Sequence, residues 1–217
     1  MIHNLRYQIN KYIFEKGYAP SVFQLSELMG LSLSKVEGGL QLLAESHAIV
    51  LHPGTFDIWV AHPFALFPTI FWVKSGEKQW WGNCPWCSFG IASLSKSDTT
   101  IYTKLSGEED AIVIEIKNRK VVQKDLVVHF PIPEKDFWNN VIYTCSMMLV
   151  FRKHSEVDFW CTQHNKPRGE VLPIQQVLDL AKKWYGNYLS EDFTLKSKER
   201  AQEIFEEMGM VSDFWKL

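Results

Sequence analysis

The sequence predicts an α+β fold in which a helical N-terminal module precedes an antiparallel-sheet core with flanking helices. Apolar residues recur every three or four positions over residues 2–45, which is typical of amphipathic helices. Short runs rich in β-branched residues follow between residues 69 and 129, and helical spacing returns after residue 174. Because these strands are joined by short turns, we expect an antiparallel sheet and not alternating strand-helix units.

The N-terminal module has the pattern of three helices followed by a hairpin. Residues 2–14 place their apolar side chains on one face, Ser21 opens a second helix, and Ser32 offers an N-cap for a third. Residues 48–61 change to short apolar runs around a Pro-Gly turn, as expected for a small β-hairpin. This arrangement resembles a winged-helix domain, and we assign residues 1–60 to a winged-helix-like helical module.

The charge of this module argues against DNA binding. Between Ser21 and His47 there are one lysine and three glutamates, so the charge is 1 − 3 = −2. A DNA-reading helix presents Lys or Arg, because phosphate contacts supply most of the affinity. We therefore expect a structural or substrate-covering role, with DNA binding as the alternative.

Residues 61–217 form the second predicted domain, an α+β unit that carries the catalytic or metal-binding chemistry. Its expected strands are 69–73, 78–81, 99–104, 111–116 and 126–129, and its expected C-terminal helices are 174–184 and 197–208.

The composition is that of an ordinary globular protein. Of 217 residues, 46% are hydrophobic and 22% are charged, which excludes a mainly disordered chain. Lys+Arg 23 and Asp+Glu 25 give a net charge of −2, so no global field favours nucleic acid or an anionic membrane. The N-terminus lacks an apolar leader and no apolar run approaches about 18 residues, so we expect a cytoplasmic protein with no membrane segment.

The most informative chemistry lies at a Cys-x-x-Cys motif. A strand is expected to end at Trp81, and Pro85 suits the first turn of a helix, so Cys84 is expected at a helix N-terminus with Cys87 one turn along. Unpaired N–H groups and the helix dipole stabilise a thiolate there. Cys84 is thus a candidate nucleophile or soft-metal ligand.

A lone Cys-x-x-Cys leaves several functions open. A redox-active Cys-x-x-Cys motif usually lies in a βαβ unit, and the sequence predicts no such unit here. A structural zinc site needs a second pair of ligands. Cys161-x-x-His164 has a spacing that zinc sites use, whereas Cys145 alone is as well explained as a buried apolar residue.

Two separated motifs together resemble the organomercurial (alkylmercury) lyase family, from about Phe67 to the helix around Trp184. They are WWGNCPWCSFGIASL and YTCSMMLVF, followed by Asp158, Trp160 and His164. The resemblance implies an active site of two cysteines and one aspartate, at Cys84, Cys145 and the position of Cys87. This chain departs from the family at that last position, where a cysteine stands in place of the aspartate.

The resemblance implies cleavage of a carbon–mercury bond by protonolysis, giving Hg(II) and a hydrocarbon. Mercury(II) is a soft cation that prefers thiolates, so Cys84 and Cys145 are expected to bind it. Cys87, with an ordinary thiol pKa of about 8.5, is expected to stay protonated and to occupy the acid position. Cys84, Cys87 and Cys145 are therefore the predicted catalytic and metal-binding residues, no cofactor is required, and Hg(II) is bound as product.

The implied partners are a small organomercurial substrate, small thiols and a mercuric reductase downstream. The alternative is a non-catalytic protein that binds or senses soft metals such as Hg, Cu or Zn through its thiols. Both functions require the sulfur atoms of Cys84, Cys87 and Cys145 to converge on one cavity, with Cys161 outside it.

Overall fold

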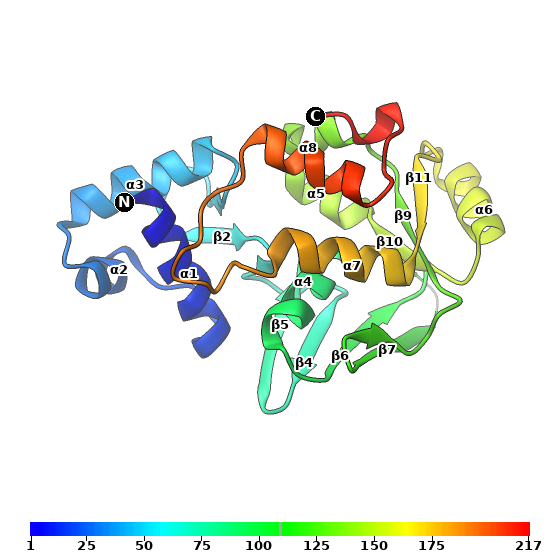
Figure 1. The fold of residues 1–217 in the computed structure, drawn as a ribbon, viewed down its shortest axis with the longest axis horizontal. Helices are drawn as coiled ribbons and strands as arrows, with labels where there is room; N and C mark the ends of the chain where they lie inside the picture. Colours follow the sequence, from blue (N-terminus) through cyan, green and yellow to red (C-terminus); the bar gives the residue numbers. More distant parts are fainter. Residues whose placement is uncertain (109) are drawn as a thin grey trace.

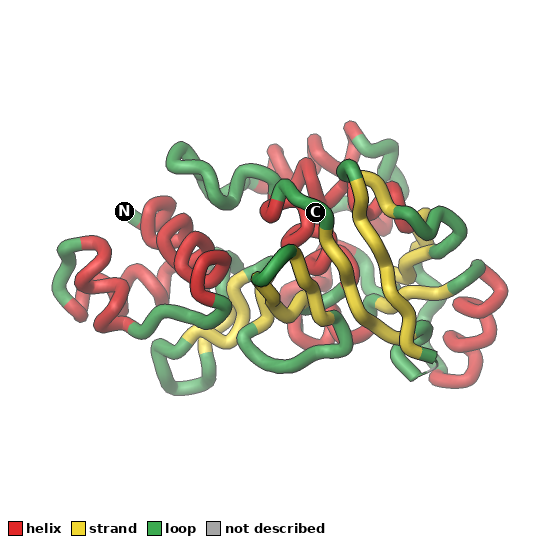
Figure 2. Tube along the Cα trace, turned by 90° about the horizontal axis from the view of Figure 1, so that it is seen from below, coloured by secondary structure: helices red, strands yellow, loops and turns green. Residues whose placement is uncertain are grey.

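The structure is a computed structural model that describes residues 1–108 and 110–217 of the chain. Helices come first and antiparallel sheets with flanking helices follow, as the α+β prediction requires (Figure 1). Seen from below, the N-terminal helices lie at one end and the strands occupy the middle and the opposite end (Figure 2).

Three helices form the N-terminal part: α1 (Ile2–Lys16), α2 (Val22–Met29) and α3 (Leu33–Glu45). Ser21 caps α2 with a capping box, because its hydroxyl accepts from the backbone N–H of Gln24 and the Gln24 side chain accepts from the backbone N–H of Ser21. Leu5, Leu25 and Leu40 are buried between the helices and belong to the main core. The winged-helix likeness of this module stays a prediction.

One sheet has eight strands, all paired antiparallel, in the order β1-β2-β3-β5-β4-β6-β7-β8. The strands are β1 (Val50–Leu51), β2 (Ile58–Ala61), β3 (Phe64–Ala65), β4 (Trp72–Ser75), β5 (Lys78–Gly82), β6 (Thr99–Lys104), β7 (Ala111–Lys117) and β8 (Lys120–Val121). The predicted hairpin is present as β1 and β2, and β2 then pairs with β3 across the predicted boundary at residue 60.

Strand β4 begins later than the sequence predicts. The Thr69 hydroxyl donates to the carbonyl of Gly82 at 2.7 Å and accepts from the backbone N–H of Phe71 at 3.0 Å. These side-chain bonds tie Thr69 to Gly82 at the end of β5 and to Phe71, and the regular pairing of β4 starts at Trp72.

A second sheet has three strands in the order β10-β9-β11. It consists of β9 (Val127–Phe130), β10 (Leu149–Phe151) and β11 (Glu170–Pro173), and it is accompanied by η1 (Glu134–Asn139), α5 (Val141–Met147) and α6 (His154–His164). Helix α5 carries Cys145 into the interior.

Helix α4 (Pro85–Ser95) lies against β4 and β5 on one side and α7 (Ile174–Tyr185) on the other. The two helices approach closely at Gly90, where a Cβ atom would stand 2.5 Å from Cδ2 of Tyr185. The chain after α7 returns beside the N-terminal helices before α8 (Lys198–Glu207), and there the backbone N–H of Leu195 donates to Nδ1 of His3 (Figure 1). The segment between α7 and α8 thus contacts the start of α1.

No helix among the described residues combines the length and the apolar character that crossing a bilayer requires.

Candidate functional site

Cys84 is the N-cap of α4, directly after the end of strand β5. Its backbone is extended, Pro85 occupies the first helical turn, and its Sγ accepts a hydrogen bond from the backbone N–H of Cys87 at 3.4 Å. The strand-to-helix turn is so tight that a Cβ on Gly82 would stand 2.2 Å from Oγ of Ser88, which explains the glycine at this position. The predicted helix start at Cys84 is therefore correct.

Cys87 lies one turn along α4 and faces the same space. Its Sγ is 3.8 Å from Nδ1 of His62 and 3.7 Å from the hydroxyl oxygen of Tyr185. His62 follows β2 and Tyr185 ends α7, so three segments far apart in the sequence meet at this sulfur.

Cys145 reaches the same point from α5. The ligand atoms of His62, Cys87 and Cys145 all lie within 4.8 Å of one another. The thiol of Cys145 also hydrogen-bonds with those of Cys84 and Cys87. The structure thus brings together all three cysteines that the sequence singled out, and it buries each of them.

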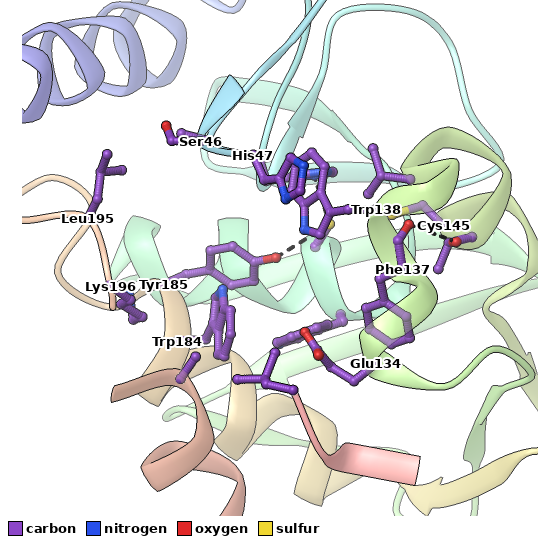
Figure 3. A pocket seen from close by; sticks show the side chains of 18 of the residues that line it. Ser46, His47, Glu134, Phe137, Trp138, Cys145, Trp184, Tyr185, Leu195 and Lys196 are labelled. Carbon is purple, nitrogen blue, oxygen red and sulfur yellow. Dashed lines mark hydrogen bonds between the residues drawn. The ribbon is translucent and has the colours of Figure 1, made fainter. Parts of the chain in front are cut away.

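These groups line one cavity of about 390 Å³, which falls in the size range of small-molecule sites. Aromatic side chains form much of its wall. Figure 3 shows Tyr185 and Trp184 on one side and Trp138 and Phe137 on the other, with Cys145 beyond them. An apolar wall lowers the local dielectric constant and so strengthens electrostatic interactions at the thiols.

The protonation of the thiols differs from the sequence-based expectation. Burial raises the pKa of Cys84 well above its ordinary value, and this outweighs the helix start that was expected to lower it. The pKa of Cys145 is also raised well above the ordinary value, first by its hydrogen bonds to Cys84 and Cys87 and then by burial. Both side chains hold their protons as thiols.

Cys87 behaves in the opposite way, and the expectation that it stays protonated is wrong. Burial alone would raise its pKa, but hydrogen bonds from Cys145, Cys84 and His62, together with the charge of His62, hold that pKa well below its ordinary value. Of the three thiols, Cys87 therefore ionises most readily.

The sequence analysis missed two residues that contact the sulfur of Cys87, His62 and Tyr185, because nothing in their local sequence marks them. His62 is 9% exposed and its Nε2 atom has no hydrogen-bond partner among the described residues. Its carbonyl accepts a hydrogen bond from the fully buried guanidinium of Arg6. Burial raises the pKa of Tyr185 well above its ordinary value, and the charge of Cys87 adds to this, so the phenol remains a hydrogen-bond donor to the thiolate.

Cys161 lies elsewhere, in a separate cluster with Val157, Trp160 and strands of the three-stranded sheet. Its Sγ is 3.7 Å from Nε2 of His129. His164 turns away to Glu108, with 3.3 Å between Nε2 and Oε1, so the Cys161-x-x-His164 spacing does not form a shared ligand pair. Within the described ranges, His62, Cys87 and Cys145 are the one group of three such ligands close enough to share a metal ion.

Comparison with known proteins relates this geometry to a family. The chain has the same fold as the crystal structure of the mercury-bound form of MerB2, with a TM-score of 0.65 and 18% sequence identity over 86% of this chain and 90% of that chain. A search of curated proteins gave no significant match. The family model for alkylmercury lyase (MerB) matches residues 64–186, which is more than half of the chain and includes Cys84, Cys87 and Cys145. The chain therefore belongs to the alkylmercury lyase family.

Proposed function

We propose that this protein cleaves the carbon–mercury bond of organomercurials, releasing a hydrocarbon and retaining Hg(II) on cysteine sulfur. The observation that carries the proposal is the meeting of three buried thiol groups in one cavity of an alkylmercury lyase-family chain. Mercury prefers such soft ligands to water, imidazole or carboxylate. A mercury-bound relative with the same fold supports the same interpretation.

Cys87 makes the first bond to mercury in this proposal. The substrate enters as an organomercury cation bound to a small thiolate, and the Cys87 thiolate displaces that thiolate from mercury. A lowered pKa makes Cys87 the nucleophile at neutral pH. Tyr185 and His62 hold the sulfur from two sides and stabilise its charge.

The proton for the carbon atom comes from Cys84 or Cys145. As the thiol sulfur bonds to mercury, its S–H bond weakens and the proton passes to the carbon. The carbon–mercury bond breaks, carbon–hydrogen and mercury–sulfur bonds form, and mercury stays in the +2 state. The raised pKa values of Cys84 and Cys145 support this step, since each thiol keeps its proton until mercury binds.

The decisive experiment measures hydrocarbon release from an organomercurial in the presence of excess small thiol. We expect Cys84→Ser and Cys145→Ser each to lower the rate by more than the roughly 10- to 100-fold that loss of an outer partner costs at a metal site. Cys161→Ser is the matched control, because it removes a buried thiol outside the cavity. Equal rates in all three variants, or no release by the wild type, would contradict the proposal.

A second candidate function is non-catalytic binding of a soft metal. It is favoured by the His62, Cys87 and Cys145 group, whose nitrogen and two sulfur atoms suit Hg(II), Cu(I) or Zn(II). Titration with each metal, followed by thiolate charge-transfer absorbance, tests it. Metal binding without hydrocarbon release would establish this function over the lyase.

A sensing version of this function needs the N-terminal helices to bind DNA. The net charge of −2 around the second and third helices would repel the DNA phosphates, so we expect no DNA binding. An electrophoretic shift assay at low salt, where protein–DNA affinity is greatest, separates sensing from sequestration. The proposed partners in either case are small thiols that accept the metal, and a mercuric reductase that consumes Hg(II).

A further inference from the structure

The Cys-x-x-Cys motif is the part of the site at which this chain departs from the pattern that the family resemblance implies. With an aspartate at the position of Cys87, Cys84 would have no second sulfur on its own helix. Here the motif places two thiols on the first turn of α4, directly after strand β5. Two neighbouring thiols can form a sulfur–sulfur bond, which a thiol and a carboxylate cannot do.

The start of α4 holds the two sulfur atoms of the motif against each other. Cys84 is the N-cap, and its Sγ accepts a hydrogen bond from the backbone N–H of Cys87 at 3.4 Å. The two thiols also hydrogen-bond with each other. A disulfide joins Cα atoms about 4.4 to 6.8 Å apart, and one helical turn rises about 5.4 Å, so rotation of the two side chains is enough to close the bond.

Cys145 contacts the same sulfur atoms, but it belongs to a different element. Its Sγ lies within 4.8 Å of Sγ of Cys87, and its thiol hydrogen-bonds with both cysteines of the motif. A disulfide to Cys145 would tie α4 to α5 and draw together two helices in a close-packed interior. A bond inside the motif uses one element only and leaves Cys145 as a thiol.

The motif faces a cavity that has room for a small reactant. Cys84 and Cys87 both line the cavity of about 390 Å³ that was described above. Sγ of Cys87 is also 3.7 Å from the hydroxyl oxygen of Tyr185 and 3.8 Å from Nδ1 of His62. These polar groups can hydrogen-bond to a sulfur that leaves during exchange. Cys87 is therefore placed to attack first and Cys84 to attack second.

We propose that Cys84 and Cys87 also act as a dithiol–disulfide pair that exchanges with small disulfides, with Cys87 as the attacking sulfur and Cys84 as the resolving sulfur. This activity goes beyond the proposed function, because it uses neither mercury nor Cys145. In the oxidised protein the disulfide occupies both thiols of the motif, and mercury would meet Cys145 alone. Organomercurial cleavage would then depend on the balance of small thiols and disulfides.

The exchange is balanced in atoms and electrons. Cys87 attacks one sulfur of the small disulfide, a mixed disulfide forms on Cys87, and the first small thiolate leaves. Cys84 then attacks Sγ of Cys87, the disulfide of the motif forms, and the second small thiolate leaves. The protons of the two cysteine thiols end on the two released thiols. The protein is oxidised by two electrons and the small disulfide is reduced by two.

Disulfide mapping of the native protein tests the proposal. Fully reduced protein is incubated with bis(2-hydroxyethyl) disulfide, the remaining thiols are blocked with N-ethylmaleimide, and the protein is digested with trypsin. Trypsin leaves Cys84 and Cys87 together in peptide 79–96 and Cys145 in peptide 136–152. Mass spectrometry therefore distinguishes a disulfide inside the motif from one that links the two peptides.

We expect peptide 79–96 of the wild type to lose two hydrogen atoms, to take up no N-ethylmaleimide, and to regain both thiols with dithiothreitol. Cys87→Asp should lose this product completely, because the second sulfur is gone. Cys145→Ser should keep it, although the proposed function requires Cys145 for cleavage. Cys161→Ser is the matched control, since it removes a buried thiol outside the cavity, and it should also keep the product.

Two double variants test which sulfur attacks first. In Cys84→Ser/Cys145→Ser, Cys87 has no resolving thiol and should stop at the mixed disulfide with 2-mercaptoethanol. In Cys87→Ser/Cys145→Ser, the mixed disulfide should form on Cys84 about tenfold more slowly. Equal rates would overturn the assignment of Cys87 as the attacking sulfur.

Three results of the mapping overturn the pair itself. They are an unmodified peptide 79–96 in the wild type, a mixed disulfide that does not close, and a main product that links this peptide to peptide 136–152. A failure of the proposed function looks different, because the reduced wild type then releases no hydrocarbon from an organomercurial. A reversible disulfide inside the motif establishes the exchange pair whether or not hydrocarbon is released.

Discussion

Nδ1 of His62 lies 3.8 Å from Sγ of Cys87, although the two residues are on different elements and 25 positions apart. The contact pairs an imidazole with the cysteine at the position where the family resemblance implies an aspartate. An aspartate is anionic without help, whereas a thiol needs a neighbour that stabilises its thiolate. After Cys145 and Cys84, His62 is therefore a neighbour that helps a cysteine to carry negative charge at this point.

Replacing His62 with glutamine should raise the pKa of Cys87, because the variant removes the imidazole's hydrogen bond and its positive charge. The thiolate absorbance of the metal-free protein, followed against pH, measures this directly, since Cys84 and Cys145 keep their protons. His154→Gln is the control at an exposed histidine. An unchanged titration in His62→Gln would show that burial and the other thiols alone set this pKa.

Replacing Cys87 with aspartate restores the family's residue and should weaken the retention of Hg(II). A carboxylate is a hard oxygen ligand, so the product loses one of the sulfur atoms that hold it. We expect faster loss of Hg(II) to small thiols and an increased rate of turnover wherever product release limits it. Dialysis of mercury-loaded protein against thiol, with the metal content measured over time, checks the first point. Slower loss from Cys87→Asp than from the wild type would contradict it.

The sequence predicted the elements well where a local pattern defines them. Helix α4 begins at Cys84 because a strand end, a proline and a cysteine follow one another within a few residues. Strands β6 and β7 have the predicted starting residues, since β-branched residues and a short turn specify them. The three cysteines of the candidate site were found because their spacing matches a family motif.

What the sequence could not predict is the protonation and the wall of the site. Three residues of the cavity wall lie far from Cys84 in the sequence: His62 is 84 − 62 = 22 positions away, Lys196 is 196 − 84 = 112 positions away, and Arg6 lies between these extremes. The order of the thiol pKa values depends on which sulfur contacts His62 and on how deeply each sulfur is buried. Both are properties of the tertiary structure. A helix start alone predicted the wrong cysteine as thiolate, because the burial of Cys84 outweighs the dipole.

Glu134 should make the protein less stable as the pH rises. Its pKa is raised to about 7 in the folded state from an ordinary value of 4.5, so the folded state binds the proton more tightly than the unfolded state. Its carboxyl group therefore destabilises the fold progressively between pH 4.5 and about 7. Glu134→Gln should match the wild type near the lower limit and exceed it by about 1 to 3 kcal/mol above the upper limit.

Urea denaturation of both proteins on the two sides of this pH range measures the difference in unfolding free energy. Glu15→Gln, at an exposed glutamate, is the control and should show no such pH-dependent gain. A gain for Glu134→Gln that is equal at both pH values would mean that packing and not ionisation is responsible.

The close approach of α4 and α7 at Gly90 should set the geometry of the thiolate. A Cβ atom at this position would lie 2.5 Å from the ring of Tyr185 and 2.9 Å from Cβ of Pro63, the residue after His62. Gly90→Ala must therefore displace the Tyr185 ring and Pro63, the neighbour of His62, and overpacking of this kind costs about 1 to 3 kcal/mol. The pKa of Cys87 should rise as well, because His62, which helps to lower it, is expected to move with Pro63. Gly38→Ala, in an open part of α3 with no atom within 4 Å of the added Cβ, should stabilise the protein by about 0.5 to 1 kcal/mol. Thermal unfolding and the pH titration of the thiolate, measured on both variants, test the two effects separately. If Gly90→Ala loses stability but keeps the low pKa of Cys87, then Tyr185 and His62 follow the displaced backbone together and the thiolate site is a unit that moves with α7.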